Sequence, residues 1–157
     1  MEKLQLVLTT EPSDVVVSLV TGLERVLSAE YPPEQRHGLS IDAIFRPHIR
    51  FFVAWIDGAA VGCGGVALFA DFAEVKRMFV RETARGQGVA QAILERLAEV
   101  ARQAGVKTLR LETGTQQLAA IKLYERAGFH RCAAFGDYAA MPAAAVATSL
   151  FFERPLG

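Results

Sequence analysis

Cysteine, an excess of charge and long apolar runs are all scarce or missing in this sequence of 157 residues. The two cysteines, Cys63 and Cys132, lie far apart without a CxxC partner, so neither a disulfide framework nor a metal cluster is indicated. We expect both to be reduced core residues. Seventeen basic and seventeen acidic side chains cancel, which removes the positive field typical of nucleic-acid binders. No apolar run approaches the roughly 18 residues that a membrane helix needs.

Further absences narrow the expected location and chemistry. Residues 1–4 lack a basic region followed by an apolar stretch, so no secretory signal is visible, and we expect a soluble, cytoplasmic protein. The three histidines, His37, His48 and His130, show no ligand spacing such as HxxxH, and we expect no metal. The length suits one compact core, so residues 1–157 are predicted to form a single domain. Because the charges cancel and no long apolar run is present, we expect neither nucleic-acid nor membrane partners.

The N-terminal half alternates between strand and helix patterns. Leucines at every second position of residues 4–8 predict a strand with one buried face. Ser13 then precedes apolar residues at helical spacing up to Leu27, and the prolines after Tyr31 end this predicted helix. Between residues 49 and 69, two β-rich runs flank Asp57-Gly58, a dipeptide typical of a two-residue hairpin turn.

The C-terminal half predicts crossover units. The pattern gives a strand at 72–80, a helix from 89 to 104, a strand at 108–113, a helix at 117–127 and a strand from 129. Strand, helix, strand, helix, strand indicates two right-handed crossovers and a three-layer α/β arrangement. A last strand is expected at 149–153, and the alanine-rich residues 139–147 are expected to be a loop.

A glycine-containing turn stands at the predicted start of the helix at 89–104. Its sequence is Arg85-Gly86-Gln87-Gly88-Val89-Ala90. A helix start offers unpaired N–H groups and a partial positive charge, and glycines allow a phosphate to approach the backbone. A GxG pattern alone fits a tight strand-to-helix turn equally well. Gln91 breaks the dinucleotide-binding fingerprint, and the Lys-Ser or Lys-Thr of a P-loop is missing.

Two segments together resemble one known family. Arg85-x-x-Gly88-x-Ala90 matches the Q/R-x-x-G-x-G/A signature of the GNAT superfamily of acetyl-CoA-dependent N-acetyltransferases, and Ala120-x-x-Leu123-Tyr124-Glu125-x-x-Gly128-Phe129 resembles its later helix and strand. The resemblance implies an acyl-CoA N-acyltransferase fold: a mixed, mostly antiparallel sheet of about seven strands flanked by about four helices. It also implies acetyl-CoA as cosubstrate.

The resemblance assigns cofactor-binding roles along the chain. The main chain of Met78 and Val80 is expected to pair with the pantetheine arm of coenzyme A, where this strand splays from the one starting at Thr108. Gln117 stands where the family often has an asparagine that contacts the cofactor, and its amide can make similar hydrogen bonds. Tyr124 lies on the helix that lines the other side of the cofactor. The residues expected to hold the pyrophosphate are Arg85, Gly86, Gly88, Val89 and Ala90.

Acetylating an amine requires a base, because an alkyl ammonium with a pKa of about 10 is almost fully charged at neutral pH. Glu74 resembles in position the glutamate base of the histone-acetylating branch, and strand alternation predicts that Glu74, Lys76, Met78 and Val80 share one face. Glu74 is equally explained as a strand glutamate paired with Lys76. Glu112 is a rival base on the neighbouring strand, and either carboxylate can act through a water.

The resemblance also names the other catalytic groups. The backbone N–H of Met78 is the candidate for polarising the thioester carbonyl, since an oxyanion needs a fixed donor. Tyr124 matches the family tyrosine that protonates the leaving thiolate. Tyr124 is also explained as an aromatic residue that packs a helix against the core.

Three functions stay open from the sequence. The first is direct acetyl transfer from acetyl-CoA to a primary amine in a ternary complex; the others are a noncatalytic acyl-CoA sensor and a structural domain. The expected acceptor is a small-molecule or amino-acid-like amine, with a peptide or protein amine also open, and so is a homodimer. Arg46, His48 and Arg50 are either a carboxylate-binding group or a solvated basic cluster, and residues 135–138 are either a pocket wall or a turn.

Overall fold

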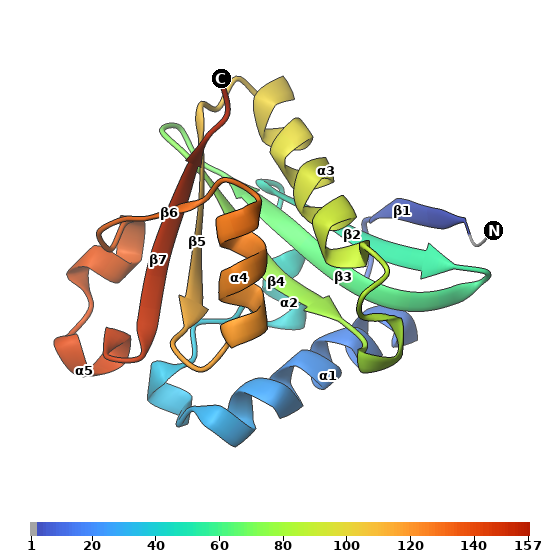
Figure 1. Cartoon of the computed structure of the whole chain (residues 1–157), viewed down its shortest axis with the longest axis horizontal. Coiled ribbons are helices and arrows are strands. Elements are labelled where there is room, and N and C mark those ends of the chain that lie inside the picture. The colour runs from blue at the N-terminus through green and yellow to red at the C-terminus, as the bar shows by residue number, and fades with distance from the viewer. Residues whose placement is uncertain (1–2) are drawn as a thin grey trace.

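A seven-stranded mixed sheet forms the middle layer of the molecule (Figure 1). The computed structural model describes residues 3–157, so Met1 and Glu2, where a secretory signal would begin, lie outside the described residues. The strand order is β1-β2-β3-β4-β5-β7-β6, and only β4 and β5 pair in parallel. The strands are β1 (Leu4–Thr9), β2 (Ile49–Ile56), β3 (Ala59–Leu68), β4 (Ala73–Val80), β5 (Thr108–Gly114), β6 (His130–Arg131) and β7 (Ser149–Pro155).

The N-terminal half has the elements that its sequence predicts. Helix α1 (Asp14–Glu30) begins where the Ser13 side chain accepts a hydrogen bond from the Val16 amide, and it ends before the two prolines. In the β2–β3 hairpin, Asp57 and Gly58 both have positive φ angles, 48° and 79°, as a type I′ turn requires. The short helix α2 (Ile41–Ile44), capped by Ser40, was not predicted.

The crossovers form as predicted, with one rearrangement. Helix α3 (Val89–Gln103) connects β4 to β5, which lie side by side in parallel. Helix α4 (Leu118–Arg126) connects β5 to β6, but β7 is inserted between these two strands and pairs antiparallel to both. The strand predicted from residue 129 is reduced to the two residues of β6, because β6 pairs with β7 only at those positions.

Helices cover both faces of the sheet and bury two hydrophobic clusters. Helices α3 and α4 pack on one face, hereafter the α3 face, and α1 and α2 pack on the other, the α1 face (Figure 1). Cys63 is fully buried on the α1 face, as expected for a core residue, whereas Cys132 is only partly buried. The largest fully buried side chains are Phe51, Phe129, Phe152, Leu19, Ile44, Ile93, Leu94, Leu97, Leu109 and Leu111.

The segment between β6 and β7 contains short helical pieces where a loop was predicted. A 3-10 turn, Gly136–Ala140, is followed by the four-residue helix α5 (Ala143–Val146). This segment contacts the chain just after α1: the Thr148 hydroxyl donates to the Gln35 amide oxygen at 3.2 Å, and the His37 ring lies 2.7 Å from the Ala145 carbonyl oxygen. Across residues 3–157, no helix has both the length and the apolar character that crossing a membrane would need.

Candidate active site

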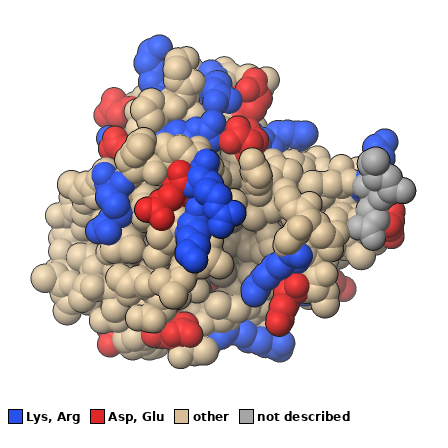
Figure 2. All heavy atoms as spheres, viewed as in Figure 1, with Lys and Arg blue, Asp and Glu red and all other residues tan. Residues whose placement is uncertain are grey.

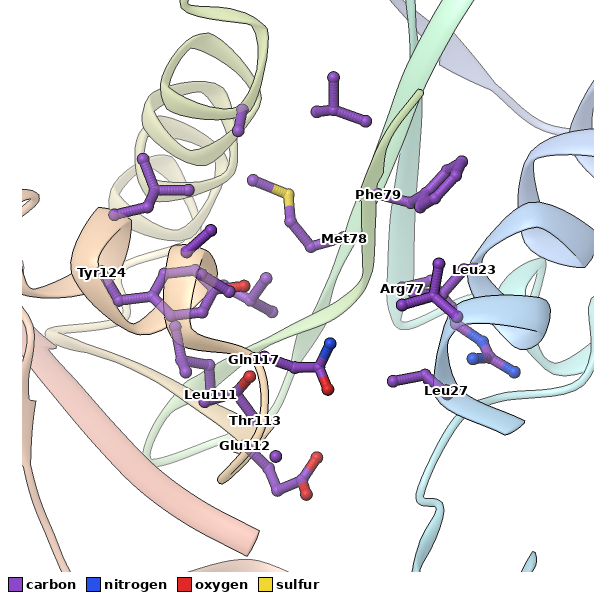
Figure 3. A pocket seen from close by; sticks show the side chains of 18 of the residues that line it. Leu23, Leu27, Arg77, Met78, Phe79, Leu111, Glu112, Thr113, Gln117 and Tyr124 are labelled. Atoms are coloured by element: carbon purple, nitrogen blue, oxygen red, sulfur yellow. The ribbon is translucent and has the colours of Figure 1, made fainter. Parts of the chain in front are cut away.

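A cleft opens in the sheet where β4 and β5 separate. The two strands pair only at Ala73–Leu109 and Glu74–Arg110, and beyond these residues they diverge, as the sequence analysis predicts. The resulting cleft has a volume of about 800 Å³ and is bordered by α1, α4 and the start of α3. Figure 2 shows a hollow in the face that Figure 1 presents, with Lys and Arg side chains beside it. Figure 3 shows the side chains that point into it.

An extra residue in β4 determines which side chains enter this cleft from each face. Cys63 pairs with Phe79 and Gly65 pairs with Lys76, so Gly64 alone stands opposite both Arg77 and Met78. Arg77 takes up this β-bulge with a φ of 55°, a left-handed conformation that costs an L-residue roughly 1–2 kcal/mol. The Arg77 side chain is held there by a 3.0 Å hydrogen bond from Nε to the Leu39 carbonyl and by an ion pair with Glu24.

Because of the bulge, the side chains of β4 do not alternate between the two faces as the sequence predicts. Met78 packs with the α3-face cluster, whereas Phe79 packs with the α1-face cluster (Figure 3). Upstream of the bulge the order is reversed, because Val75 lies in the α3-face cluster and Lys76 pairs across from Gly65 on the α1 face. Glu74 and Lys76 therefore face α1, and Met78 and Val80 face α3. The four side chains do not share one face, since an inserted residue shifts the period-2 pattern by one position.

The predicted phosphate turn forms at the α3 end of the cleft. Gly86 and Gly88 have φ angles of 80° and 78°, and a Cβ added at either position would meet no atom within 4 Å. Gly88 is the N-cap of α3, so the unpaired N–H groups of the first helical turn face this open space. The cleft is lined by all the predicted cofactor-binding residues: Met78, Val80, Arg85, Gly86, Gly88, Val89, Ala90, Gln117 and Tyr124.

Helix α4 brings two polar side chains to the cleft. Gln117 precedes the helix and points into the middle of the cavity (Figure 3), where its Oε1 is buried without a hydrogen-bond partner among residues 3–157. Tyr124 packs its ring against Phe129 and Phe152 and lines the cleft. Burial, and to a smaller extent the charge of Glu112, raise the pKa of Tyr124 above its usual value, so its hydroxyl keeps its proton at neutral pH.

Glu74 lies at the point where the strands separate, but its carboxylate is already bonded. The side chain is buried, and its Oε2 accepts a 2.7 Å hydrogen bond from the Tyr138 hydroxyl. Lys76 Nζ lies 2.9 Å from the same oxygen and donates to the Tyr138 hydroxyl oxygen at 3.0 Å. The pairing of Glu74 with Lys76 is therefore present, although it is buried and includes a tyrosine from the 3-10 turn after β6.

Glu112 enters the cleft from β5 with fewer partners. The Ser149 hydroxyl donates to its Oε2 at 2.6 Å, and within residues 3–157 no Lys or Arg forms an ion pair with it. Burial raises the pKa of Glu112, and the charge of Glu74 adds to this, whereas the Ser149 hydrogen bond, His37 and the charge of Lys76 lower it; the net effect is a raised pKa. A carboxylate with a raised pKa is a stronger base than an ordinary one.

Four more residues line the cleft; the sequence indicates one of them, Tyr138, within the possible pocket wall at residues 135–138, but it does not single out the other three. Tyr31, Arg36 and His37 follow α1, and Tyr138 comes from the segment after β6; all four line the cleft. The Tyr31 hydroxyl accepts the Gln116 amide at 2.8 Å, and the rings of His37 and Tyr138 pack edge to face at 5.5 Å. Their only signal in the sequence is that aromatic and basic side chains occur in two non-periodic segments.

The basic cluster considered from the sequence lies elsewhere. Arg46 and Arg50 border a second, smaller hollow beside β1, and the His48 ring packs on Phe69. None of the three lines the cleft. Of the alternative roles for residues 135–138, the pocket wall is the one that Tyr138 fills.

Comparisons with known proteins agree with this geometry. The family model of the acetyltransferase (GNAT) family matches residues 20–129. A protein of Azospirillum brasilense described as IAA acetyltransferase is 43% identical over 145 residues, covering 91% of this chain and 92% of its own. The N-acetyltransferase YsnE of Bacillus subtilis (strain 168), whose function is uncharacterized, is 35% identical over 144 residues, covering 90% of this chain and 92% of its own.

A solved structure shows the same fold with a cofactor bound. The PaiA N-acetyltransferase of Thermoplasma acidophilum, in complex with coenzyme A, superposes with a TM-score of 0.72 over 98% of this chain and 99% of its own, at 14% identity. That likeness concerns the fold, whereas the family model covers well over half of the chain. The expected acyl-CoA N-acyltransferase fold is thus confirmed, and the chain is an N-acetyltransferase that belongs to the GNAT family.

Proposed function

We propose that the protein transfers an acetyl group from acetyl-CoA to the primary amine of a small molecule by direct attack within a ternary complex. One observation carries the proposal. A single cleft contains a helix start with open space for an anion, a protonated tyrosine and a carboxylate that forms no ion pair within residues 3–157. A protein that only senses acyl-CoA needs the first of these features and has no use for the other two.

The residues on the α3 side fit the cofactor. The open space at Gly86 and Gly88 leaves room for the pyrophosphate against the helix start, with Arg85 beside it. The buried Gln117 Oε1 is an acceptor without a donor, and an amide N–H of the pantetheine arm would supply one. Beyond Glu74, β4 has no strand on its β5 side, so its main chain can pair with the same arm.

Glu112 is the carboxylate that we assign as the base. Glu74 is neutralised by Lys76 and hydrogen-bonded by Tyr138, so it is poorly placed to take a further proton. Glu112 faces the same cleft, forms no ion pair with any residue of 3–157, and is favoured in its protonated form by burial. It would take a proton from the acceptor ammonium, directly or through a water, and leave a neutral amine to attack the thioester carbonyl.

The remaining groups complete the transfer. The amine nitrogen forms a bond to the carbonyl carbon, and the Met78 N–H is the donor that would stabilise the negative charge on the carbonyl oxygen. The carbon–sulfur bond then breaks, and Tyr124 gives its proton to the sulfur. The second proton of the attacking nitrogen replaces the one that Tyr124 has lost, and Glu112 releases the first proton to solvent, so the products are the N-acetylated amine, coenzyme A and one proton.

The first test is binding of the cosubstrate. Titration calorimetry with acetyl-CoA and desulfo-CoA should show micromolar binding that Gly88→Glu abolishes, because the new side chain fills the turn and adds a negative charge beside the phosphates. Gln103→Glu is the matched control, since it places the same charge at the other end of α3. If the unchanged protein, folded by circular dichroism, binds neither ligand, acetyl-CoA dependence is wrong.

A further inference from the structure

Two arginines line the part of the cleft on the α1 face of the sheet, hereafter the acceptor half, and both contact the same carboxylate. Arg77 from β4 and Arg36 from the segment after α1 both line the cleft and both contact Glu24 of α1. Two positive charges against one negative charge leave this corner with a net positive charge. The nearby Lys76 leaves this balance unchanged, because its own positive charge is paired with Glu74.

Arg77 and Arg36 differ in how many of their guanidinium N–H groups have hydrogen-bond partners. Arg77 is 7% exposed and bonds both Leu39 and Glu24, so it is committed to holding the β4 bulge. Arg36 makes one contact with Glu24, at 3.4 Å from Nη1, and its side chain is 22% exposed. Its Nε is buried and has no hydrogen-bond partner among residues 3–157. A guanidinium carries five donors in a fork that matches a carboxylate, and most of those of Arg36 are available.

Arg36 is on the same side of the cleft as the proposed base. Its neighbour His37 lies near enough to Glu112 to lower the pKa of that carboxylate. The His37 ring also packs against Tyr138. The cofactor-binding turn lies on the opposite, α3 face of the sheet. An acceptor held between Arg36 and Glu112 therefore meets a cationic site and an anionic site within one cleft.

We propose that the acceptor is an amino acid or a closely similar molecule, in which Arg36 binds a carboxylate while the amine faces Glu112. This inference rests on the acetyl transfer proposed above. A zwitterion matches both ends of the site, whereas a simple amine leaves the buried Arg36 Nε without a partner and a diamine adds repulsion at Arg36. An unpaired buried donor costs enough to distinguish these ligands.

Helix α1 gives the acceptor half of the cleft an apolar wall. Leu23, Val26 and Leu27 project from α1 into it, and Figure 3 shows Leu23 and Leu27 beside Arg77. Val26 is 37% exposed, so apolar surface is open to solvent here. An apolar amino-acid side chain would cover this surface, so leucine and phenylalanine are expected to be better acceptors than glutamate or lysine.

The test compares amino acids with the amines that lack only their carboxylate. Acetylation of leucine against 3-methylbutylamine, and of phenylalanine against 2-phenylethylamine, is followed by coenzyme A release. We expect kcat/KM to favour each amino acid by about 10- to 100-fold, the range of a hydrogen bond to a charged group. Arg36→Met should abolish that preference, mainly through KM, and Arg36→Lys should restore part of it. Arg46→Met, at the second hollow, is the control and should change neither.

The outcomes separate the inference from the function on which it rests. A variant is compared only if its melting temperature and acetyl-CoA affinity match those of the unchanged protein. If acetyl-CoA binds but amines are acetylated as well as amino acids, or the preference survives Arg36→Met, the inference is overturned and acetyl transfer stands. Binding of acetyl-CoA without acetylation of any pair also overturns it. Loss of acetyl-CoA binding in the unchanged protein overturns the proposed function instead.

Discussion

The hydroxyl of Tyr138 donates a 2.7 Å hydrogen bond to the carboxylate of Glu74, which lies 64 positions earlier in the chain. Lys76 contacts both groups, so the three side chains form a closed ring of polar contacts. Burial and the adjacent Glu74 charge raise the pKa of Tyr138 above its usual value, so it remains a donor at physiological pH. The ring connects the segment after β6 to β4 at the point where the cleft begins.

Removing that hydroxyl should destabilise the fold more than it slows catalysis. Tyr138→Phe keeps the aromatic contacts with Phe135 and Phe151 and leaves Glu74 with one partner fewer. We expect the free energy of unfolding to fall by about 1–3 kcal/mol. A double-mutant cycle with Glu74→Gln, measured by urea denaturation, should give a coupling of similar size. Additive effects of the two substitutions would contradict the ring.

Glu112→Gln should remove the acidic limb of the pH–rate profile. In the unchanged protein, kcat/KM for the amine should fall as Glu112 becomes protonated, at a pH above the usual carboxyl range because burial raises its pKa. The variant should be slower by about 10²- to 10⁴-fold near neutral pH. Glu74→Gln is the matched control and should retain the limb; if the limb instead disappears with Glu74, the base is Glu74.

The same substitution should stabilise the protein at neutral pH. The folded state binds the Glu112 proton more tightly than the unfolded chain does, so ionised Glu112 opposes folding at every pH above its raised pKa. Below the unfolded-state pKa of about 4.3, both states are protonated and the effect vanishes. The melting temperature of Glu112→Gln should therefore exceed that of the unchanged protein near pH 8, with a difference that narrows steadily towards pH 4. An equal difference at both pH values would argue against a raised pKa.

Tyr124→Phe should separate catalysis from binding. The ring contacts with Phe129 and Phe152 are kept, so folding and acetyl-CoA affinity should change little. Loss of the proton donor to the thiolate should lower kcat by about 10²-fold. Single-turnover kinetics with saturating acetyl-CoA measure the chemical step directly. A kcat within a factor of two of the original would leave Tyr124 with a packing role only.

Gly64→Ala should lower stability and weaken acetyl-CoA binding, because Gly64 lies opposite the β4 bulge and beside Met78. A Cβ at this position would lie 2.7 Å from Ile93 Cγ2 and 2.9 Å from Met78 Sδ. Both neighbours are side-chain atoms, so they can shift, and we expect a loss of about 1–3 kcal/mol from overpacking. Calorimetry should also show weaker acetyl-CoA binding, because Met78 lies beside the cofactor site. Unchanged stability together with unchanged affinity would mean that the neighbours move without cost.

The sequence predicts well those features that depend on neighbouring residues. Asp57-Gly58 identifies the hairpin, Ser13 identifies a helix start, and the Gly86–Gly88 turn identifies the start of α3, where we propose that a phosphate binds, because each signal is local. The bulge was not predictable in this way. Its left-handed residue is Arg77 rather than glycine, and the contacts that hold it come from Glu24 and Leu39, distant in the chain.

The cleft-lining residues after α1 were not predicted, for a similar reason. Tyr31, Arg36 and His37 follow a helix in a segment without periodicity, and Tyr138, which packs on His37, is about a hundred residues away. Nothing near Arg36 in the sequence shows that its Nε becomes buried. From the sequence, Arg46 and Arg50 are equally suitable for binding a carboxylate, but in the structure they border a different hollow. Only the packing of the segment after α1 against the segment after β6 distinguishes the two groups.

The bulge in β4 also gives one strand two separate sets of side chains. Residues before it, Glu74 and Lys76, lie on the α1 face, where we propose that the acceptor binds, and residues after it, Met78 and Val80, lie on the α3 face, proposed for the cofactor. A substitution that alters the choice of acceptor can therefore occur in the first set without disturbing the second. New amine specificities should evolve, or be engineered, upstream of Arg77 while the use of the thioester donor is inherited unchanged.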